Sequence, residues 1–372
     1  NPLGVYARYC FEQVGGPAYL TMIPDGDHFV YCDRVFAPRS GARAEQSAKI
    51  ISVTSAFLER HLKDREVAVE ADEPRASETA RLGPGEHSLT LSVAGVGRKY
   101  VVHVPPTYRD QQPIPVVLMF HGGGGTARAT IAETGLTKKA DQAGFIAVFP
   151  EGTAPDPSKP GRFRDNPQTW NDGSGRFHAG QNNVDDVGFV NALIDDLLSR
   201  FSIDPKRIYA AGFSNGSSMA YRLGAELPQR LAAIAPIASS GLRVEVAQLA
   251  RPVPLLVIQG TADPRNPLEG GDVLVFGKID KRPPVADVVR RWAKLNGCSD
   301  TPKILRDDNG IKALAYSSDS GTGEVHFYTV EGLGHTWPGG KSLLPESLVG
   351  KTSTKLQAND VIWDFFSRHA LP

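Results

Sequence analysis

From residue 82 onward, short apolar runs alternate along the chain with segments whose apolar residues recur at helical spacing. The clearest helix follows Asp186, where apolar side chains from Val190 to Phe201 fall at i, i+3, i+4, i+7, i+8 and i+11 and so share one face. The runs 115–120 and 145–149 are unbroken and apolar, as buried strands are. This alternation predicts an α/β fold with a mostly parallel sheet covered by helices.

The same patterns place the remaining elements. The predicted strands cover 88–93, 99–104, 115–120, 145–149, 207–211, 231–238, 253–259 and 324–330. The predicted helices cover 126–143, 187–201, 214–223, 285–295 and 356–369. Residues 151–183 are rich in Gly, Pro, Asp and Asn, and loops of this length are usually functional. We therefore expect them to form one wall of a substrate site, with a solvated insertion as the alternative.

Residues 1–63 repeat the pattern at the end of the chain. A predicted strand over 18–23 precedes His28, and a helical stretch ends at 56–62. His28 and Phe57 are 29 residues apart, and His335 and Phe365 are 30 apart. We predict an accessory segment over 1–63 that is like the end of the chain, a linker over 64–84, and a main domain over 85–372. A lone strand and helix cannot bury enough surface to stand alone, so we expect a non-catalytic segment that docks on the main domain, extends its sheet or pairs with another copy of the chain.

Composition excludes several classes of function. Lys+Arg and Asp+Glu both number 41, so the formal net charge of zero gives no electrostatic case for nucleic acid. No apolar run approaches the roughly 18 residues that span a bilayer. The cysteines, Cys10, Cys32 and Cys298, have no metal-ligand spacing, and we predict no metal and no cofactor. Cys10 and Cys32 either pair or are small buried side chains.

The sequence Gly-Phe-Ser-Asn-Gly at 212–216 matches the nucleophile elbow G-x-S-x-G, between a predicted strand and a predicted helix. The serine of such a turn is strained, and a side chain at either glycine would collide with neighbouring backbone. The turn lifts the hydroxyl of Ser214 above the sheet edge and sets the N–H of Asn215 at a helix N-terminus, where it can face a developing oxyanion. We predict Ser214 as a nucleophile.

Four glycines follow His121 directly after a predicted strand. Esterases use such a run to supply a second oxyanion N–H, because glycine lets the backbone approach the substrate. We predict Gly123 as that donor, with Asn215 as the other. A flexible turn is the alternative.

Asp263 and His335 each follow a predicted strand, and His335 lies in a glycine-rich loop. Each alone has a structural explanation, the aspartate as a turn former and the histidine as a bystander. However, the order Ser214, Asp263, His335 is that of the α/β-hydrolases. We predict these three residues as a catalytic triad.

Three other side chains are predicted to contact substrate. Trp170 lies in the long loop, Trp337 follows the predicted catalytic histidine, and His121 begins the glycine run. An indole covers a flat apolar group well, although ordinary packing explains both tryptophans too. His121 is expected to orient its loop rather than to titrate. The pair Asp185 and Asp186 suits a helix N-cap better than a metal site.

As a set, these motifs resemble the polyhydroxybutyrate depolymerase-like esterases, a family that overlaps with feruloyl and acetylxylan esterases. The resemblance covers 85–372 and rests on residues 121–125, 169–171, 183–189, 212–216, 260–263 and 334–340. It implies a secreted or periplasmic carboxylic ester hydrolase without a cofactor, with Ser214, Asp263 and His335 as triad. Members often pair the cysteine at the position of Cys298, whereas residues 315–318 here offer no partner.

The leading hypothesis is therefore a serine esterase that acts through an acyl-enzyme. Its expected substrates are polyhydroxyalkanoate-like polyesters, feruloyl or other aromatic esters, or short acyl esters. A serine peptidase or an acyltransferase on the same fold is the first alternative, since a triad does not choose the bond. A non-catalytic binding protein is the second.

Overall fold

The computed structural model describes residues 20–22, 29–31 and 82–372, apart from 240, 276–277 and 320. The chain divides into two units, Asn1–Ser77 and Glu78–Pro372. In the first, β1 (Leu20–Met22) pairs antiparallel with β2 (Phe29–Tyr31), which confirms a strand within 18–23. The predicted helix ending at 56–62, His28, Cys10, Cys32 and most of the predicted linker lie outside the described residues.

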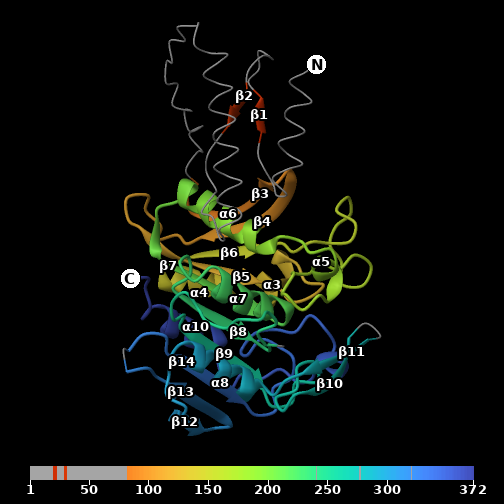
Figure 1. Cartoon of the computed structure of the whole chain (residues 1–372), viewed down its shortest axis with the longest axis vertical. Coiled ribbons are helices and arrows are strands. Elements are labelled where there is room, and N and C mark those ends of the chain that lie inside the picture. Colours follow the sequence, from red (N-terminus) through yellow and green to blue (C-terminus); the bar gives the residue numbers. More distant parts are fainter. Residues whose placement is uncertain (1–19, 23–28, 32–81, 240, 276–277, 320) are drawn as a thin grey trace, which may run out of the picture. The chain divides into compact units, whose positions relative to one another are not determined.

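A ten-stranded sheet organises the second unit, in the order β12-β13-β14-β9-β8-β7-β5-β6-β4-β3 (Figure 1). The six inner strands run parallel. They are β5 (Ile114–Phe120), β6 (Ile146–Pro150), β7 (Ile203–Phe213), β8 (Ala233–Ile237), β9 (Leu255–Gly260) and β14 (Val325–Val330). An antiparallel pair flanks them at each end. These pairs are β3 (Gly85–Val93) with β4 (Val96–Val104), and β12 (Lys303–Asp308) with β13 (Ile311–Tyr316).

Helices cover both faces of the sheet, because alternate residues of each buried strand point to opposite sides. Leu118 of β5 belongs to one apolar core and Met119 to the other. The core of Leu118 is completed by α6 (Asp186–Arg200), α7 (Asn215–Glu226) and α8 (Val285–Leu295). The core of Met119 is completed by α3 (Ala127–Thr134), α4 (Leu136–Ala143) and α10 (Ala358–Phe366). The predicted α/β-hydrolase fold is confirmed.

Several elements differ from the prediction. The helix expected over 126–143 is two helices, α3 and α4, because Gly135 adopts φ +62° and interrupts the turn. The sequence analysis missed β12, β13 and four short elements. These are α5 (Phe177–Gln181), α9 (Glu346–Val349) and the hairpin of β10 (Gly271–Val275) with β11 (Lys278–Arg282). The strands β10 and β12 are largely exposed, so they lack the apolar pattern that marks a buried strand.

Cys298 is a free thiol that lies 3.3 Å from the carbonyl oxygen of Gly323, and burial raises its pKa to about 11. The expectation that it has no local disulfide partner is thus confirmed. Across the described part of the chain, no helix combines the length and apolarity needed to span a membrane.

Candidate active site

The turn between β7 and α7 has the strained geometry predicted for a nucleophile elbow. Ser214 adopts φ +56° and ψ −115°, a conformation that non-glycine residues rarely occupy. A Cβ on Gly212 would lie 2.1 Å from the carbonyl oxygen of Gly216, and a Cβ on Gly216 would lie 2.3 Å from that of Phe120. Both glycines are therefore required on steric grounds.

The loops after β7, β9 and β14 bring together the three side chains predicted as a triad. Ser214 Oγ donates to His335 Nε2 at 2.9 Å, and His335 Nδ1 donates to Asp263 Oδ2 at 2.8 Å. The other carboxylate oxygen of Asp263 accepts the backbone N–H groups of Arg265 and Asn266, each at 2.8 Å. These bonds fix the carboxylate, which in turn orients the imidazole and can stabilise its protonated form.

The backbone around His335 is packed too closely to admit a side chain before it. Its own N–H donates to the carbonyl of Val349, and Gly334 N–H donates to that of Lys351 at 2.8 Å. A Cβ on Gly334 would lie 2.3 Å from the Val349 carbonyl oxygen. The glycine that precedes the histidine thus lets the loop after β14 dock on the segment near α9.

His121 is buried and holds the glycine run after β5. The N–H of Gly152 donates to Nε2 at 2.9 Å, so the ring proton is on Nδ1, which donates to the carbonyl of Gly122 at 2.7 Å. Burial lowers the pKa of His121, which keeps the ring neutral. His121 does not line the cleft above Ser214. Contrary to the prediction, His121 is not placed to contact a substrate in this cleft, and its two hydrogen bonds are consistent with the expected role in orienting the loop.

Two backbone N–H groups near Ser214 are available to a ligand. Gly123 and Asn215 both border the cleft, and within the described residues neither N–H is bonded to a protein acceptor. A Cβ on Gly122 would lie 3.3 Å from that of Ser214, so the glycine run passes directly beside this serine. The geometry is suitable for an oxyanion hole.

The side chain of Asn215 has a role that the sequence did not reveal. Its Oδ1 accepts the backbone N–H of Trp170 at 2.8 Å, and its Nδ2 donates to the Trp170 carbonyl at 3.2 Å. Nδ2 also donates to Asp172 Oδ2 at 3.0 Å. The residue predicted to offer an oxyanion N–H therefore also fastens the loop after β6 to the start of α7.

Neither predicted tryptophan lies in the main cleft. The indole of Trp170 is buried against Phe120, and its Nε1 donates to the carbonyl of His121 at 3.0 Å. The prediction that Trp170 lines the substrate pocket is wrong, because its ring is fully buried and bonded to the backbone carbonyl of His121. Trp337 borders a smaller cavity on another side of His335 and donates to Asn359 at 3.1 Å.

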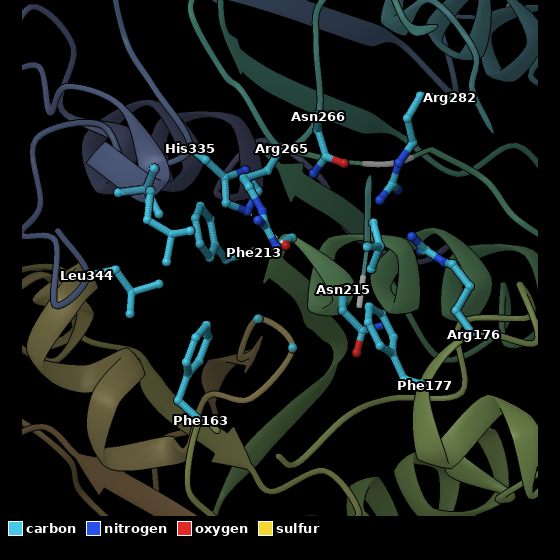
Figure 2. A pocket seen from close by; sticks show the side chains of 16 residues that line it. Phe163, Arg176, Phe177, Phe213, Asn215, Arg265, Asn266, Arg282, His335 and Leu344 are labelled. Atoms are coloured by element: carbon cyan, nitrogen blue, oxygen red, sulfur yellow. Dashed lines mark hydrogen bonds between the residues drawn. The ribbon is translucent and has the colours of Figure 1, made fainter. Parts of the chain in front are cut away.

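An open cleft of about 730 Å³, counting the space at its mouth, lies above Ser214 (Figure 2). The long loop after β6 contributes Phe163, Arg176 and Phe177, so residues 151–183 form one wall of this cleft, and its use by a substrate stays a prediction. The other lining residues are Gly122, Gly123, Phe213, Ser214, Asn215, Arg265, Asn266, Val275, Arg282, His335, Leu344, Leu348 and Val349. Phe177 adopts φ +57°, so the wall includes a second strained residue.

The predicted N-cap is present at Asp185, whose Oδ1 accepts the N–H of Gly188 at 2.8 Å. Asp186 is instead buried, where Oδ1 lies 2.6 Å from Arg98 and Oδ2 accepts the N–H of Asn171 at 2.7 Å. Over the residues that the structure describes, no group of three or more His, Cys, Asp or Glu side chains is arranged to hold a metal ion.

Sequence reasoning missed the cationic end of the cleft. Arg176 and Arg282 line it, and both pair with Asp280, at 2.6 and 3.1 Å. Arg243 pairs with the same carboxylate at 2.9 Å. Asp280 and Arg282 belong to the hairpin β10–β11, more than 100 positions from Arg176 in the chain. No local motif joins residues so far apart, so the sequence carried no signal for this cluster.

Comparison with known proteins agrees with this geometry. The family model described as esterase PHB depolymerase matches residues 98–296. The chain belongs to this family. The esterase is therefore a carboxylic ester hydrolase, and the peptidase and non-catalytic alternatives are not supported.

Relatives of this esterase carry related names. It is 31% identical over 293 residues to "Putative esterase NocK" of Nocardia uniformis subsp. tsuyamanensis, covering 73% of this chain and 80% of that protein. It is 30% identical over 281 residues to "Feruloyl esterase B" of Piromyces equi, covering 74% of this chain and 46% of that one. It thus spans about half the length of the latter relative. The solved "Acetyl xylan esterase from Aspergillus awamori" shares the fold, with a TM-score of 0.51 at 14% identity over 76% of this chain and 99% of that one.

Proposed function

We propose that this esterase cleaves its substrates through an acyl-enzyme on Ser214, with His335 and Asp263 completing a triad. The observation that carries the proposal is the unbroken path of hydrogen bonds from Ser214 Oγ through His335 to Asp263, at 2.9 and 2.8 Å. Two N–H groups without protein acceptors, those of Gly123 and Asn215, border the same cleft. These contacts support Ser214 as nucleophile, His335 as base, Asp263 as orienting carboxylate and the two N–H groups as oxyanion donors.

The chemistry follows in two halves. His335 Nε2 takes the hydroxyl proton as Ser214 Oγ attacks the ester carbonyl, and the Gly123 and Asn215 N–H groups stabilise the oxyanion. His335 then gives its proton to the leaving alcohol as the carbonyl re-forms on Ser214. Water repeats the sequence on the acyl-enzyme, releasing the acid and restoring the serine. Asp263 accepts the hydrogen bond from Nδ1–H throughout and stabilises the imidazolium.

We further propose that the substrates are short acyl, aromatic or hydroxyalkanoate esters. Three phenylalanines line the cleft: Phe163, Phe177 and Phe213. Aromatic rings favour flat apolar groups, so a cleft lined by three of them suits small esters of this kind. Relatives are named "Feruloyl esterase B" and "Poly(3-hydroxyalkanoate) depolymerase C", the latter 24% identical over 255 residues and from Paucimonas lemoignei. We also propose export to the periplasm or the medium, which fractionation of the producing cells tests.

Turnover of a panel of p-nitrophenyl esters tests the mechanism, together with labelling by a fluorophosphonate. We expect hydrolysis by the wild type, a mass increase on Ser214, and the loss of both in Ser214→Ala. Ser199→Ala is a matched control, since that hydroxyl is exposed on α6 and bonds only to a neighbouring carbonyl. Full activity in Ser214→Ala, or a label on another residue, would refute the proposal.

A further inference from the structure

Arg282 is a buried cation with unmet hydrogen-bonding capacity at the edge of the cleft. The residue is 7% exposed and ends strand β11. Its Nη2 lies 3.1 Å from Asp280 Oδ2, whereas Nε and Nη1 are buried and have no partner among the described residues. Because buried polar groups are nearly always bonded, a guanidinium with two nitrogens unpartnered at a cleft indicates a position where a ligand supplies the acceptor.

The surroundings of Arg282 carry a surplus of positive charge. Asp280 is shared by Arg176, Arg243 and Arg282, at 2.6, 2.9 and 3.1 Å. Asp172 adds one more carboxylate, 2.8 Å from Arg176. Three guanidinium groups thus face two carboxylates, which leaves one positive charge unbalanced.

The pKa shifts of Arg282 and Asp280 agree with this surplus of positive charge. Burial, followed by the repulsion of Arg176, lowers the pKa of Arg282 to about 9. Burial also opposes ionisation of Asp280, but the three arginines outweigh it and hold the pKa of that carboxyl below its usual value. A second anion beside Arg282 would relieve the repulsion among the arginines.

The position of the cations relative to the reacting atoms indicates which part of the substrate they face. Figure 2 shows Arg176 and Arg282 on one side of the cleft, with His335 and Leu344 on the other. The leaving alcohol must be near His335, because that residue protonates it. The acyl part therefore extends away from His335, in the direction of the arginines.

We propose that the cleft accepts esters whose acyl part carries a second, ionised carboxylate, bound by Arg282 with the help of Arg176. The proposal rests on the proposed function, since it takes Ser214 as the point of attack. It narrows the substrate class to half-esters of dicarboxylic acids and related acyl groups. In such a substrate the free carboxylate fills the acceptor positions that Nε and Nη1 of Arg282 lack.

Kinetics on a matched pair of esters test this. In p-nitrophenyl hydrogen glutarate the acyl chain ends in a carboxylate, and in p-nitrophenyl 5-methylhexanoate an isopropyl group of similar shape takes its place. We expect the wild type to have the higher kcat/KM on the glutarate after correction for spontaneous hydrolysis. Arg282→Gln should lower the ratio of the two kcat/KM values roughly tenfold to a hundredfold, as loss of a charge-assisted hydrogen bond does. Arg290→Gln is the matched control, because that exposed arginine on α8 pairs only with Asp287 and should leave the ratio unchanged.

Further variants separate the outcomes. Arg282→Lys retains the charge without the planar fork and should give an intermediate ratio. This variant replaces Arg282→Gln in the test if thermal melting shows that Arg282→Gln does not fold. Equal ratios in wild type, Arg282→Gln and Arg282→Lys would overturn the proposal. So would a preference for esters with the carboxylate on the alcohol part that disappears in Arg265→Gln, because Arg265 also lines the cleft.

A binding measurement distinguishes this proposal from the proposed function. Calorimetry with Ser214→Ala protein and methyl hydrogen glutarate should show binding that Arg282→Gln, added to the same background, weakens. Absence of binding overturns the carboxylate site even where neutral esters are hydrolysed in a Ser214-dependent manner. Conversely, binding without any ester turnover by the wild type refutes the catalytic assignment and leaves the carboxylate site standing.

Discussion

Replacing Asn215 by alanine tests whether this side chain joins the loop after β6 to the oxyanion region. The change retains the backbone N–H that we assign to the oxyanion hole. It deletes two bonds to the Trp170 backbone, at 2.8 and 3.2 Å, and one to Asp172 at 3.0 Å. Asn215 is only 3% exposed, so bulk water does not replace these partners.

The expected cost can be worked from these contacts. Leaving the buried N–H of Trp170 without an acceptor costs about 1–3 kcal/mol, and loss of the bond to the Asp172 carboxylate costs about 1.5–3 kcal/mol. We therefore expect Asn215→Ala to lower the free energy of unfolding by roughly 3–5 kcal/mol, out of a typical total of about 5–15 kcal/mol. For a domain of this size the melting temperature should fall by roughly 10 °C. The value of kcat should fall too, because the loop beneath the glycine run loses its attachment.

Urea unfolding and ester kinetics on the same preparations provide the assay. Asn215→Asp sharpens it, since the carboxylate still accepts from Trp170 but faces Asp172 with like charge and cannot donate. Asn191→Ala is the control, because that half-buried side chain on α6 bonds to Arg230 at the surface. If Asn215→Ala unfolds within about 1 kcal/mol of the wild type and retains its kcat, the side chain does not hold the loop.

Three further predictions concern the elbow, the two histidines and acid stability. Gly212→Ala should abolish soluble, active protein because of the 2.1 Å approach to backbone, whereas Gly83→Ala, where no atom lies within 4 Å, should behave as wild type in expression and turnover. His335→Ala should abolish ester turnover while His28→Ala leaves kcat close to wild type, and turnover that depends on His28 would contradict both the triad and the non-catalytic role of residues 1–63. Hydrogen bonds from two histidines hold the pKa of Glu324 well below its usual value, so its contribution to stability is present above about pH 4.5 and is lost as the pH falls through the depressed value. The difference in unfolding free energy between wild type and Glu324→Gln should therefore shrink on acidification, and a constant difference from pH 7 to pH 3 would be evidence against this linkage.

The parts of the site that could be predicted from the sequence are those fixed by local backbone geometry. Gly212 and Gly216 are adjacent to Ser214 in the chain, and the collisions they avoid arise within a single turn. Asp263 and His335 follow parallel strands, whose carboxyl ends meet at one edge of the sheet. The order of the predicted strands and the residue types that follow them were therefore enough to predict that Ser214, Asp263 and His335 lie close together.

The features that could not be predicted depend on contacts between distant segments. A tryptophan in a long loop is typical of a pocket, but the indole of Trp170 packs against Phe120 and donates to the carbonyl of His121, 49 positions earlier. The arginine cluster needs a hairpin whose strand β10 has little apolar pattern, and its central pair, Arg176 and Asp280, is separated by 104 positions. Side-chain direction in such cases is decided by tertiary packing, which a single sequence does not display.

One chain of polar contacts has a consequence for how this enzyme can change its substrate preference over evolution. Asp172 bonds to Asn215 at 3.0 Å and to Arg176 at 2.8 Å, and Arg176 bonds to Asp280 of the hairpin at 2.6 Å. The cleft wall at Arg176 and the residue that begins α7 thus share a carboxylate. If this wall binds the acyl group as we propose, a mutation in the hairpin that admits a new substrate also acts on the side chain that follows Ser214. Selectivity and turnover rate would then change together, and adaptation to a new ester at this end of the cleft would need compensating changes around Asp172.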